Sequence, residues 1–238
     1  MNWDGYTLKT MAKNALRGSY WKAVLVSILL GLGTGYVSGN SARSGYDMGS
    51  NYAYGYTPNQ IAVAGGAITI TVVAGACIGL ALKIFLFNPL EVGGRKFMIE
   101  DLYHQTDLSE VGTGFTRNYW NVVGGMFFRD LFVTLWTLLL IVPGIIKSYE
   151  YRMVPYILAE DPDVDPQEAL RISKEMMYGE KWNTFMFDLS FIGWIILTIF
   201  SCGLVGLFYF NPYYNLSCSA LYHALKDKYF KQRIPSQV

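Results

Sequence analysis

The stretch Ile141–Trp182, IVPGIIKSYEYRMVPYILAEDPDVDPQEALRISKEMMYGEKW, decides the fold. Pro143 and Gly144 follow a long apolar run. Because proline donates no backbone hydrogen bond and glycine tolerates turn conformations, this pair predicts a tight reversal between two helices. The segment 145–159 is then apolar except for three charges, and it has about the minimum length that crosses hydrocarbon. This half of the stretch therefore predicts a membrane hairpin.

The second half of the stretch predicts an amphipathic helix at the membrane surface. Asp161 and Pro162 disfavour further helix, and Asp165 before a proline is typical of an N-cap. Apolar residues then recur on one face over residues 166–178, and Gly179 suits the C-terminal cap. Another apolar run begins directly afterwards, so we expect the next span to start there.

Composition sets the class of the protein. Apolar residues make up 52% of the 238 residues and charged residues 16%, which is typical of a membrane bundle. The net charge of +1 argues against nucleic acid as a partner. Cys77, Cys202 and Cys218 lie in apolar runs, where we expect small buried side chains. Neither they nor the two histidines have the spacing of a metal site, so we expect no metal and no cofactor.

The whole chain is expected to form one integral membrane domain, residues 1–238. We predict an all-α polytopic bundle of about six transmembrane helices arranged as three hairpins, with interfacial helices between them. The expected spans are residues 20–37, 61–87, 119–142, 145–159, 182–200 and 207–225. The interfacial helices are 7–19, 88–105 and 166–178, the external loop is 38–60, and a basic tail is 226–238. Small-residue pairs, Gly31 with Gly35 and Gly75 with Gly79, predict close helix approach.

Basic residues predict how this bundle is threaded. In the six-span arrangement nearly all of them fall on one side, which by the positive-inside rule is the cytosol. We therefore expect a multi-pass protein of a bacterial plasma membrane with an uncleaved first span and both termini cytosolic. Lys9, Lys13 and Arg17 form a stripe beside the apolar face of the first helix, so we expect this helix to lie on an anionic bilayer.

An internal repeat accompanies this pattern. Three times a polar or amphipathic segment leads to a tryptophan and two spans, at GSYW (18–21), RNYW (117–120) and GEKW (179–182). The second and sixth spans also share Phe-Asn-Pro, at 87–89 and 210–212. A structural repeat and the ordinary aromatic belt of a membrane protein both explain the tryptophans.

Several stretches resemble a known family. NPLEVGGRKFMIE, NYWNVVGGMFFRDLF, LLLIVPGIIKSYEYRMVPYILAEDP and ALRISKEMMYGEKW are similar to the domain of unknown function 975 family, bacterial integral membrane proteins. The resemblance runs from about Leu8 to Lys228, apart from the glycine-rich segment 39–59. It implies a membrane location and no established activity, so it assigns no catalytic residue. A more distant similarity, to the membrane domain of glycerophosphodiester phosphodiesterases, carries no activity because the hydrolase domain is absent.

Charge inside the predicted spans is the main chemical signal. The candidate intramembrane polar cluster is Arg129, Asp130, Glu150, Arg152 and Asp188. Charges there are costly and must pair or face water, so they indicate either a polar pathway or ion pairs that lock the bundle. From helical rise we expect Asp188 to pair with Arg129 first and with Arg152 second.

No catalytic motif occurs in the sequence, so we expect no enzyme. A cytosolic carboxylate–histidine cluster, formed by Glu91, Glu100, Asp101 and His104, is the weaker enzymatic hypothesis. The sequence favours a transport- or export-associated component for a small solute or peptide. The alternative is a scaffold or partner-binding protein of the cell envelope. Expected partners are the lipid bilayer and either another membrane protein or a second copy of the chain.

Overall fold

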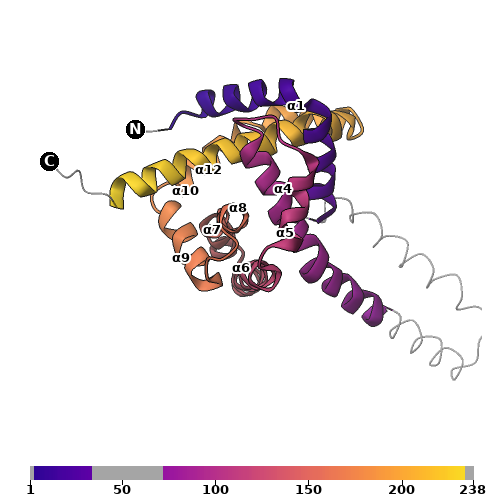
Figure 1. The fold of residues 1–238 in the computed structure, drawn as a ribbon, viewed down its shortest axis with the longest axis vertical. Coiled ribbons are helices and arrows are strands. Elements are labelled where there is room, and N and C mark those ends of the chain that lie inside the picture. Colours follow the sequence, from indigo (N-terminus) through magenta and orange to yellow (C-terminus); the bar gives the residue numbers. More distant parts are fainter. Residues whose placement is uncertain (1–2, 34–71, 234–238) are drawn as a thin grey trace, which may run out of the picture.

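The computed structural model describes residues 3–33 and 72–233, and all regular structure in this part of the chain is helical (Figure 1). This confirms the all-α class. The helices are α1 (Gly5–Gly33), η2 (Lys83–Phe87), α4 (Asn88–Glu100), η3 (Leu108–Gly112), α5 (Thr113–Thr116), α6 (Tyr119–Leu139), α7 (Ile141–Glu150), α8 (Val154–Glu160), α9 (Pro166–Met176), α10 (Lys181–Leu189), α11 (Ile192–Phe200), η4 (Gly206–Phe210) and α12 (Asn211–Arg233). Residues 72–82 are also helical and run directly into η2, and the two together are called helix 72–87. The predicted external loop 38–60 and the ends of the first two predicted spans lie outside the described residues.

Three helices in the described part of the chain are long and apolar enough to cross a membrane. They are Val72–Glu100, Tyr119–Leu139 and Lys181–Phe200. In each, one end enters the protein core while most of the apolar residues stay exposed, which is the surface a lipid environment requires. These three apolar helices suggest a membrane protein, and the arrangement of six complete spans stays a prediction.

The first described hairpin consists of α6 and α7. The ring of Phe132 lies 6.2 Å from that of Tyr151, and Lys147 lies 5.6 Å above the ring of Trp136, so the two helices are antiparallel. The reversal occurs at Leu140, whose backbone is extended at φ −155° and ψ 132°, and not at the predicted Pro143-Gly144. Proline instead occupies the first turn of α7, where its missing N–H costs no helical hydrogen bond.

The second hairpin joins α11 to η4 and α12. Cys202 and Gly203 both adopt positive φ, 51° and 88°, and turn the chain where the sequence predicted. The rings of Trp194 and Tyr209 then pack across the hairpin with their centroids 4.9 Å apart. Because Gly203 has no Cβ atom, it adopts this conformation without strain.

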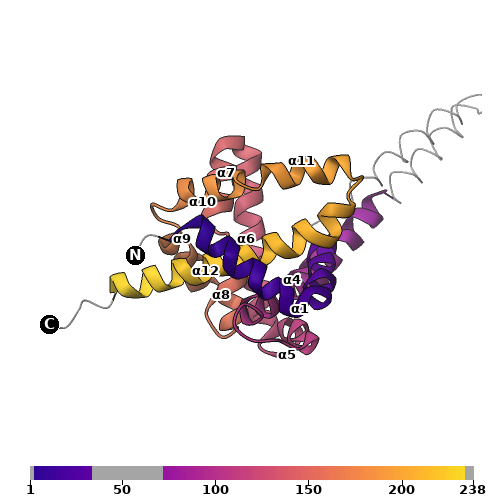
Figure 2. The same cartoon turned by 90° about the horizontal axis from the view of Figure 1, so that it is seen from above.

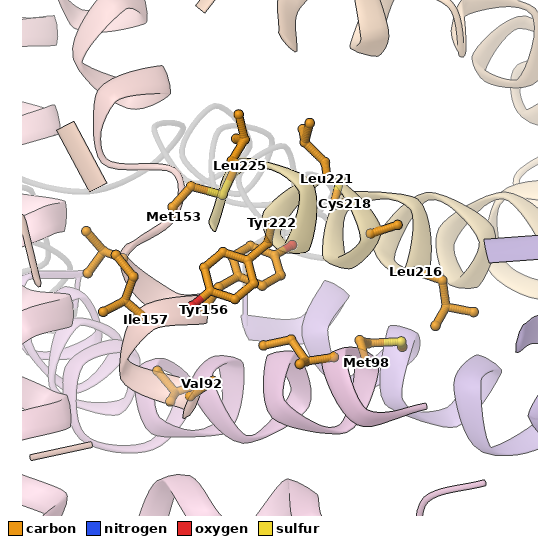
Figure 3. Packing of buried hydrophobic residues seen from close by; sticks show 14 of the residues in the cluster. Val92, Met98, Met153, Tyr156, Ile157, Leu216, Cys218, Leu221, Tyr222 and Leu225 are labelled. Carbon is orange, nitrogen blue, oxygen red and sulfur yellow. The ribbon is translucent and has the colours of Figure 1, made fainter. Parts of the chain in front are cut away.

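The core lies where α1, α4, α8, α9 and α12 meet, to one side of the exposed apolar ends (Figures 1 and 2). Met98 of α4, Met153 before α8, and Leu221 of α12 are fully buried there. The rings of Tyr156 and Tyr222 stack 5.3 Å apart at its centre (Figure 3). This core is built largely from helices that the sequence placed on a membrane surface.

The prediction that the apolar face of α1 rests on the bilayer was wrong. Leu8, Ala12 and Leu16 are buried, and α1 packs along α12 (Figures 1 and 2). A helical apolar stripe needs an apolar partner, and here another helix supplies it. The expected change from surface helix to span is present as a kink at Ser19, with φ −132° and ψ 31°.

The predicted interfacial helix 88–105 is also a core element. It ends at Glu100 as α4, and nine of its thirteen residues are buried. A Cβ atom on Gly93 would overlap the backbone carbonyl of Val111, so glycine lets α4 touch η3 directly. Such a contact explains Gly93 of NPLEVGGRKFMIE, whereas a Cβ atom on its neighbour Gly94 would meet the side chain of Leu30 in α1. By contrast, a Cβ atom added at Gly75 or Gly79 would meet no atom of the described residues within 4 Å, so the close helix contact expected of this pair stays a prediction.

Two further boundaries differ from expectation. The predicted span 145–159 is not one helix, because residues 151–153 form a turn between α7 and the buried α8. The predicted solvated tail from 226 continues α12 to Arg233, with Tyr229 buried. By contrast, the stretch 161–179 follows the prediction: Asp165 caps α9 by accepting a hydrogen bond from the Gln167 N–H at 2.8 Å. Gly179 ends that segment at φ 76°.

Glu180 ties the two ends of the described chain together. Its carboxylate accepts hydrogen bonds from Trp3 Nε1 at 3.0 Å and Asn183 Nδ2 at 2.8 Å, and it pairs with Lys228 near the end of α12. Burial alone would raise the pKa of Glu180, but the bonds from Lys228, Asn183 and Trp3 outweigh it and hold the pKa below the usual range. The start of α1 and the end of α12 therefore lie on the same side of the molecule (Figures 1 and 2).

The predicted repeat has structural counterparts. A break in regular helix precedes each marker tryptophan, at Ser19, at Asn118 with φ 45°, and at Gly179. The exposed fractions of Trp21, Trp120 and Trp182 are 72%, 73% and 70%. These similar values are consistent with three helices that each enter a membrane at an interfacial tryptophan. Both Phe-Asn-Pro sequences also close a π-helix, η2 and η4, and open a helix that enters the core.

Candidate functional site: a charged cavity between the helices

A cavity of about 690 Å³ lies between helix 72–87, α4, α6, the α7–α8 segment and α12. Its charged lining residues are Lys83, Glu91, Arg95, Arg129, Asp130 and Arg152, and its apolar walls include Leu80, Ile84, Phe127, Leu131, Val133 and Pro155. The cavity is thus amphipathic, with charges from four helical segments facing one space.

The first group of charges centres on Arg129 of α6. Its guanidinium donates to both oxygens of Glu91, at 3.3 Å each, and to Asp130 at 2.7 and 3.0 Å. Glu91 reaches this position because it lies in the first turn after Pro89, on the buried face of α4. A planar guanidinium suits two carboxylates at once, so this group links α4 to α6.

Two further cations share these carboxylates at longer range. Arg95 Nη2 lies 3.6 Å from Glu91, and Lys83 Nζ lies 3.9 Å from Asp130. Arg95 also donates to Asn215 Oδ1 at 2.8 Å, while its buried Nε has no hydrogen-bond partner in the described part of the chain. These two cations are therefore less fully neutralised than Arg129.

The second group centres on Asp188. Arg152 donates to both of its oxygens, at 2.5 and 2.9 Å, and the hydroxyls of Tyr149 and Tyr214 donate to it at 2.9 and 3.0 Å. Arg152 lines the cavity and also reaches Cys218 Sγ at 3.3 Å. Asp188 lies behind Arg152 and is not part of the cavity wall.

The structure thus brings three of the five predicted residues, Arg129, Asp130 and Arg152, to one cavity. Asp188 lies outside the cavity wall and pairs with Arg152. Glu150 faces away, because it is buried between Lys147 and Lys181 at 2.5 Å from each. It belongs to a separate ion cluster that fastens α7 to the start of α10.

The expected pairing of Asp188 with Arg129 was wrong, and the second candidate, Arg152, is the partner. Helical rise carries no information on which helices are neighbours, so it could not choose between the two arginines. Arg129 faces α4, where Glu91 was expected at the cytosolic surface. Cys77 and Cys202 are exposed in apolar segments, against the expectation of burial, whereas Cys218 is buried as expected.

Sequence reasoning missed much of the cavity. Glu91 and Arg95 are spaced i, i+4 within a glycine-containing helix, a pattern that is common on solvated surfaces. Their burial follows only from the close contacts of α4. Tyr214, shortly after the Asn-Pro of α12, carried no charge to draw attention to it.

The structure separates the residues of the weaker enzymatic hypothesis: Glu91 lines the charged cavity, whereas Asp101 and His104 line another pocket. Glu91 binds arginine, Asp101 accepts a hydrogen bond from Ser19, and Glu100 pairs with Lys96 at 3.9 Å. In the described residues no group of three or more His, Cys, Asp or Glu side chains is placed to hold a metal ion. The cavity is suited to bind a ligand. Four cationic side chains line it against two carboxylates, and Asp188 behind the wall is a third, so the charge balance favours an anion.

Comparison with known proteins gives one match. No curated protein matches the chain, and no solved structure does. Residues 125–229 match the family model described as "Protein of unknown function (DUF975)". This range contains all five predicted polar residues, whereas Glu91 and Arg95 lie outside it. The match of residues 125–229 to the DUF975 model agrees with the resemblance seen in the sequence.

Proposed function

We propose that this chain is a multi-pass component of a bacterial plasma membrane that holds a small solute or peptide in the cavity during transport or export. One observation supports the proposal most directly. A cavity of about 690 Å³, lined in part by charged side chains, lies between helices whose other surfaces are apolar and exposed. The ligand is expected to carry negative charge, because cations outnumber carboxylates around the cavity.

The cost of these charges supports a binding role. A charged side chain at the centre of a membrane helix costs about 2.5 to 3.5 kcal/mol on insertion scales. Arg129, Asp130 and Lys83 lie on two of the helices that are long and apolar enough to cross a membrane, and they concentrate several such costs at one place. Ion pairs that served only to join helices would be stabilised by close packing around them, whereas these pairs surround a space large enough for a solute.

The proposed threading has both termini in the cytosol. The distribution of basic residues supports it, and so does the docking of Trp3 and Lys228 on the same carboxylate, Glu180. The exposed apolar ends of α6, α7 and α11 would then lie in the bilayer, with the core of α1, α4 and α12 toward the cytosol. No catalytic role is part of the proposal.

A comparison of cells tests the transport role without knowledge of the solute. Small molecules would be quantified by mass spectrometry, inside and outside cells that lack the chain, express it, or express Arg129→Gln. We expect at least one anionic solute whose distribution is restored by the original chain and not by Arg129→Gln. The matched control is Arg117→Gln, because Arg117 forms an exposed ion pair with Asp163 away from the cavity. Restoration by Arg129→Gln at equal membrane abundance would contradict the proposal.

The alternative is an envelope scaffold without transport. The observation that favours it is that every charged side chain lining the cavity has an ion-pair partner, as a purely structural network requires. Under this alternative the proteins that copurify with the chain account for its role. Their identity and amount would not change in Arg129→Gln.

A further inference from the structure

We propose that the cavity binds the phosphate group of an anionic membrane lipid, with the lipid's apolar chains along the adjacent helix surfaces. This inference rests on the proposed function, since it takes the same cavity as the binding site and the same negative charge for the ligand. It goes beyond that function by giving the phosphate and the apolar chains separate binding surfaces.

The phosphate surface is assigned to Arg95 and Lys83. Their ion pairs, 3.6 and 3.9 Å, are the longest among the pairs at the cavity, because Glu91 and Asp130 are engaged more closely by Arg129. The buried Nε of Arg95 has no partner among the described residues, so this guanidinium has unused donor capacity. Guanidinium groups bind phosphate oxygens through pairs of N–H donors, and an ammonium adds a point charge.

The apolar surface is assigned to Leu80, Phe127 and Leu131. All three line the cavity and are also exposed at the outer face of helix 72–87 and α6. A ligand in the cavity is therefore in contact with residues that face the bilayer. Basic pockets between membrane helices are typical binding sites for lipid head groups, and apolar walls favour an acylated ligand over a free phosphate.

The test uses the purified, delipidated full chain in detergent. Native mass spectrometry would measure dissociation constants for phosphatidylglycerol, phosphatidylcholine and oleate, and inorganic phosphate would be added as a competitor. The variants are Lys83→Gln and Lys83→Gln with Arg95→Gln, and the control is Lys174→Gln on the exposed face of α9. Lys83→Gln keeps the test valid where loss of Arg95 impairs folding, because among the described residues the Lys83 ammonium has only its 3.9 Å ion pair to lose.

We expect phosphatidylglycerol to bind at least about tenfold more tightly than phosphatidylcholine or oleate. A basic residue near an anionic lipid contributes about 1 kcal/mol, so Lys83→Gln should weaken binding about fivefold and the double variant about 25-fold. Lys174→Gln should bind like the original chain, and millimolar phosphate should not displace the lipid.

Two results would overturn the inference. Equal affinity of the original chain and both variants for phosphatidylglycerol would show that the cavity does not hold the head group. Displacement by inorganic phosphate, with no advantage for the lipid, would assign the site to a soluble phosphate compound. Either result leaves the proposed function intact, because its test follows soluble molecules in cells and depends on Arg129.

Discussion

The ion pair between Arg152 and Asp188 allows a quantitative test of the packing behind the cavity. Asp188→Asn removes the charge that accepts two hydrogen bonds from Arg152 and leaves the guanidinium largely enclosed. Loss of one partner of a buried pair costs about 3 to 5 kcal/mol. We expect a loss at the lower end of this range in the free energy of unfolding, because the Tyr214 hydroxyl and Cys218 Sγ still contact Arg152.

The reverse change should cost less. In Arg152→Gln the carboxylate of Asp188 keeps hydrogen bonds from the hydroxyls of Tyr149 and Tyr214, at 2.9 and 3.0 Å. Each such bond contributes about 1.5 to 3 kcal/mol when one partner is charged, so we expect a loss of about 2 kcal/mol. The double variant has no unpaired charge and should be more stable than the two single losses together imply, by at least about 1.5 kcal/mol.

The assay is denaturant unfolding of the chain in detergent micelles, followed by near-ultraviolet circular dichroism. Arg117→Gln is the control, because its ion pair with Asp163 is exposed and should contribute about 0 to 1 kcal/mol. Strictly additive losses for the Arg152 and Asp188 variants would refute the reasoning. A loss in Asp188→Asn no larger than in the control would do the same.

Three further predictions concern other parts of the fold. Because the folded-state pKa of Glu180 is depressed, its contribution to stability is present above the unfolded value near 4.5 and is lost as pH falls through the lower folded value. Glu180→Gln should reduce the loss of unfolding free energy over this acidic range. An unchanged pH dependence would contradict the prediction. Gly93→Ala should destabilise the chain by about 3 kcal/mol in the same denaturant assay, because the new Cβ atom meets a backbone carbonyl of η3. The control, Gly193→Ala in α11, should not destabilise the chain, because a Cβ atom there meets no described atom within 4 Å. With the other two cysteines replaced by serine, Cys202 at the hairpin turn should react with an impermeant thiol reagent on intact cells. A cysteine that replaces Lys174 in a cysteine-free chain should react only after lysis. Labelling of both positions from outside would contradict the proposed threading.

Local features of the fold could be predicted because local residues cause them. The cap at Asp165, the stop at Pro162 and the turn at Gly203 each depend on backbone chemistry within a few residues. The three exposed tryptophans likewise mark where helices start. The expectation of a membrane protein rests on apolar composition, and three helices of suitable length and composition agree with it.

The partners of amphipathic faces could not be predicted in this way. An apolar stripe such as that of α1 fits a bilayer and a neighbouring helix equally well, and only the folded chain shows that α12 covers it. The same uncertainty hid the burial of Glu91 on α4. Charged residues in the spans were recognised from their cost, but their pairing depends on which helices are neighbours.

The most direct test of the central claim is whether the cavity inside the bundle contains water. Ser148 lines the cavity, and Leu138 lies 85% exposed on the apolar surface of the same hairpin. Each would be replaced by cysteine in a cysteine-free chain, and its reaction rate with a small charged methanethiosulfonate would be measured in proteoliposomes. Because this reagent requires an ionised thiol, the claim predicts reaction at residue 148 at least about tenfold faster than at residue 138. Equal rates, or protection of residue 148, would contradict a solute-accessible cavity at Arg129 and Arg152.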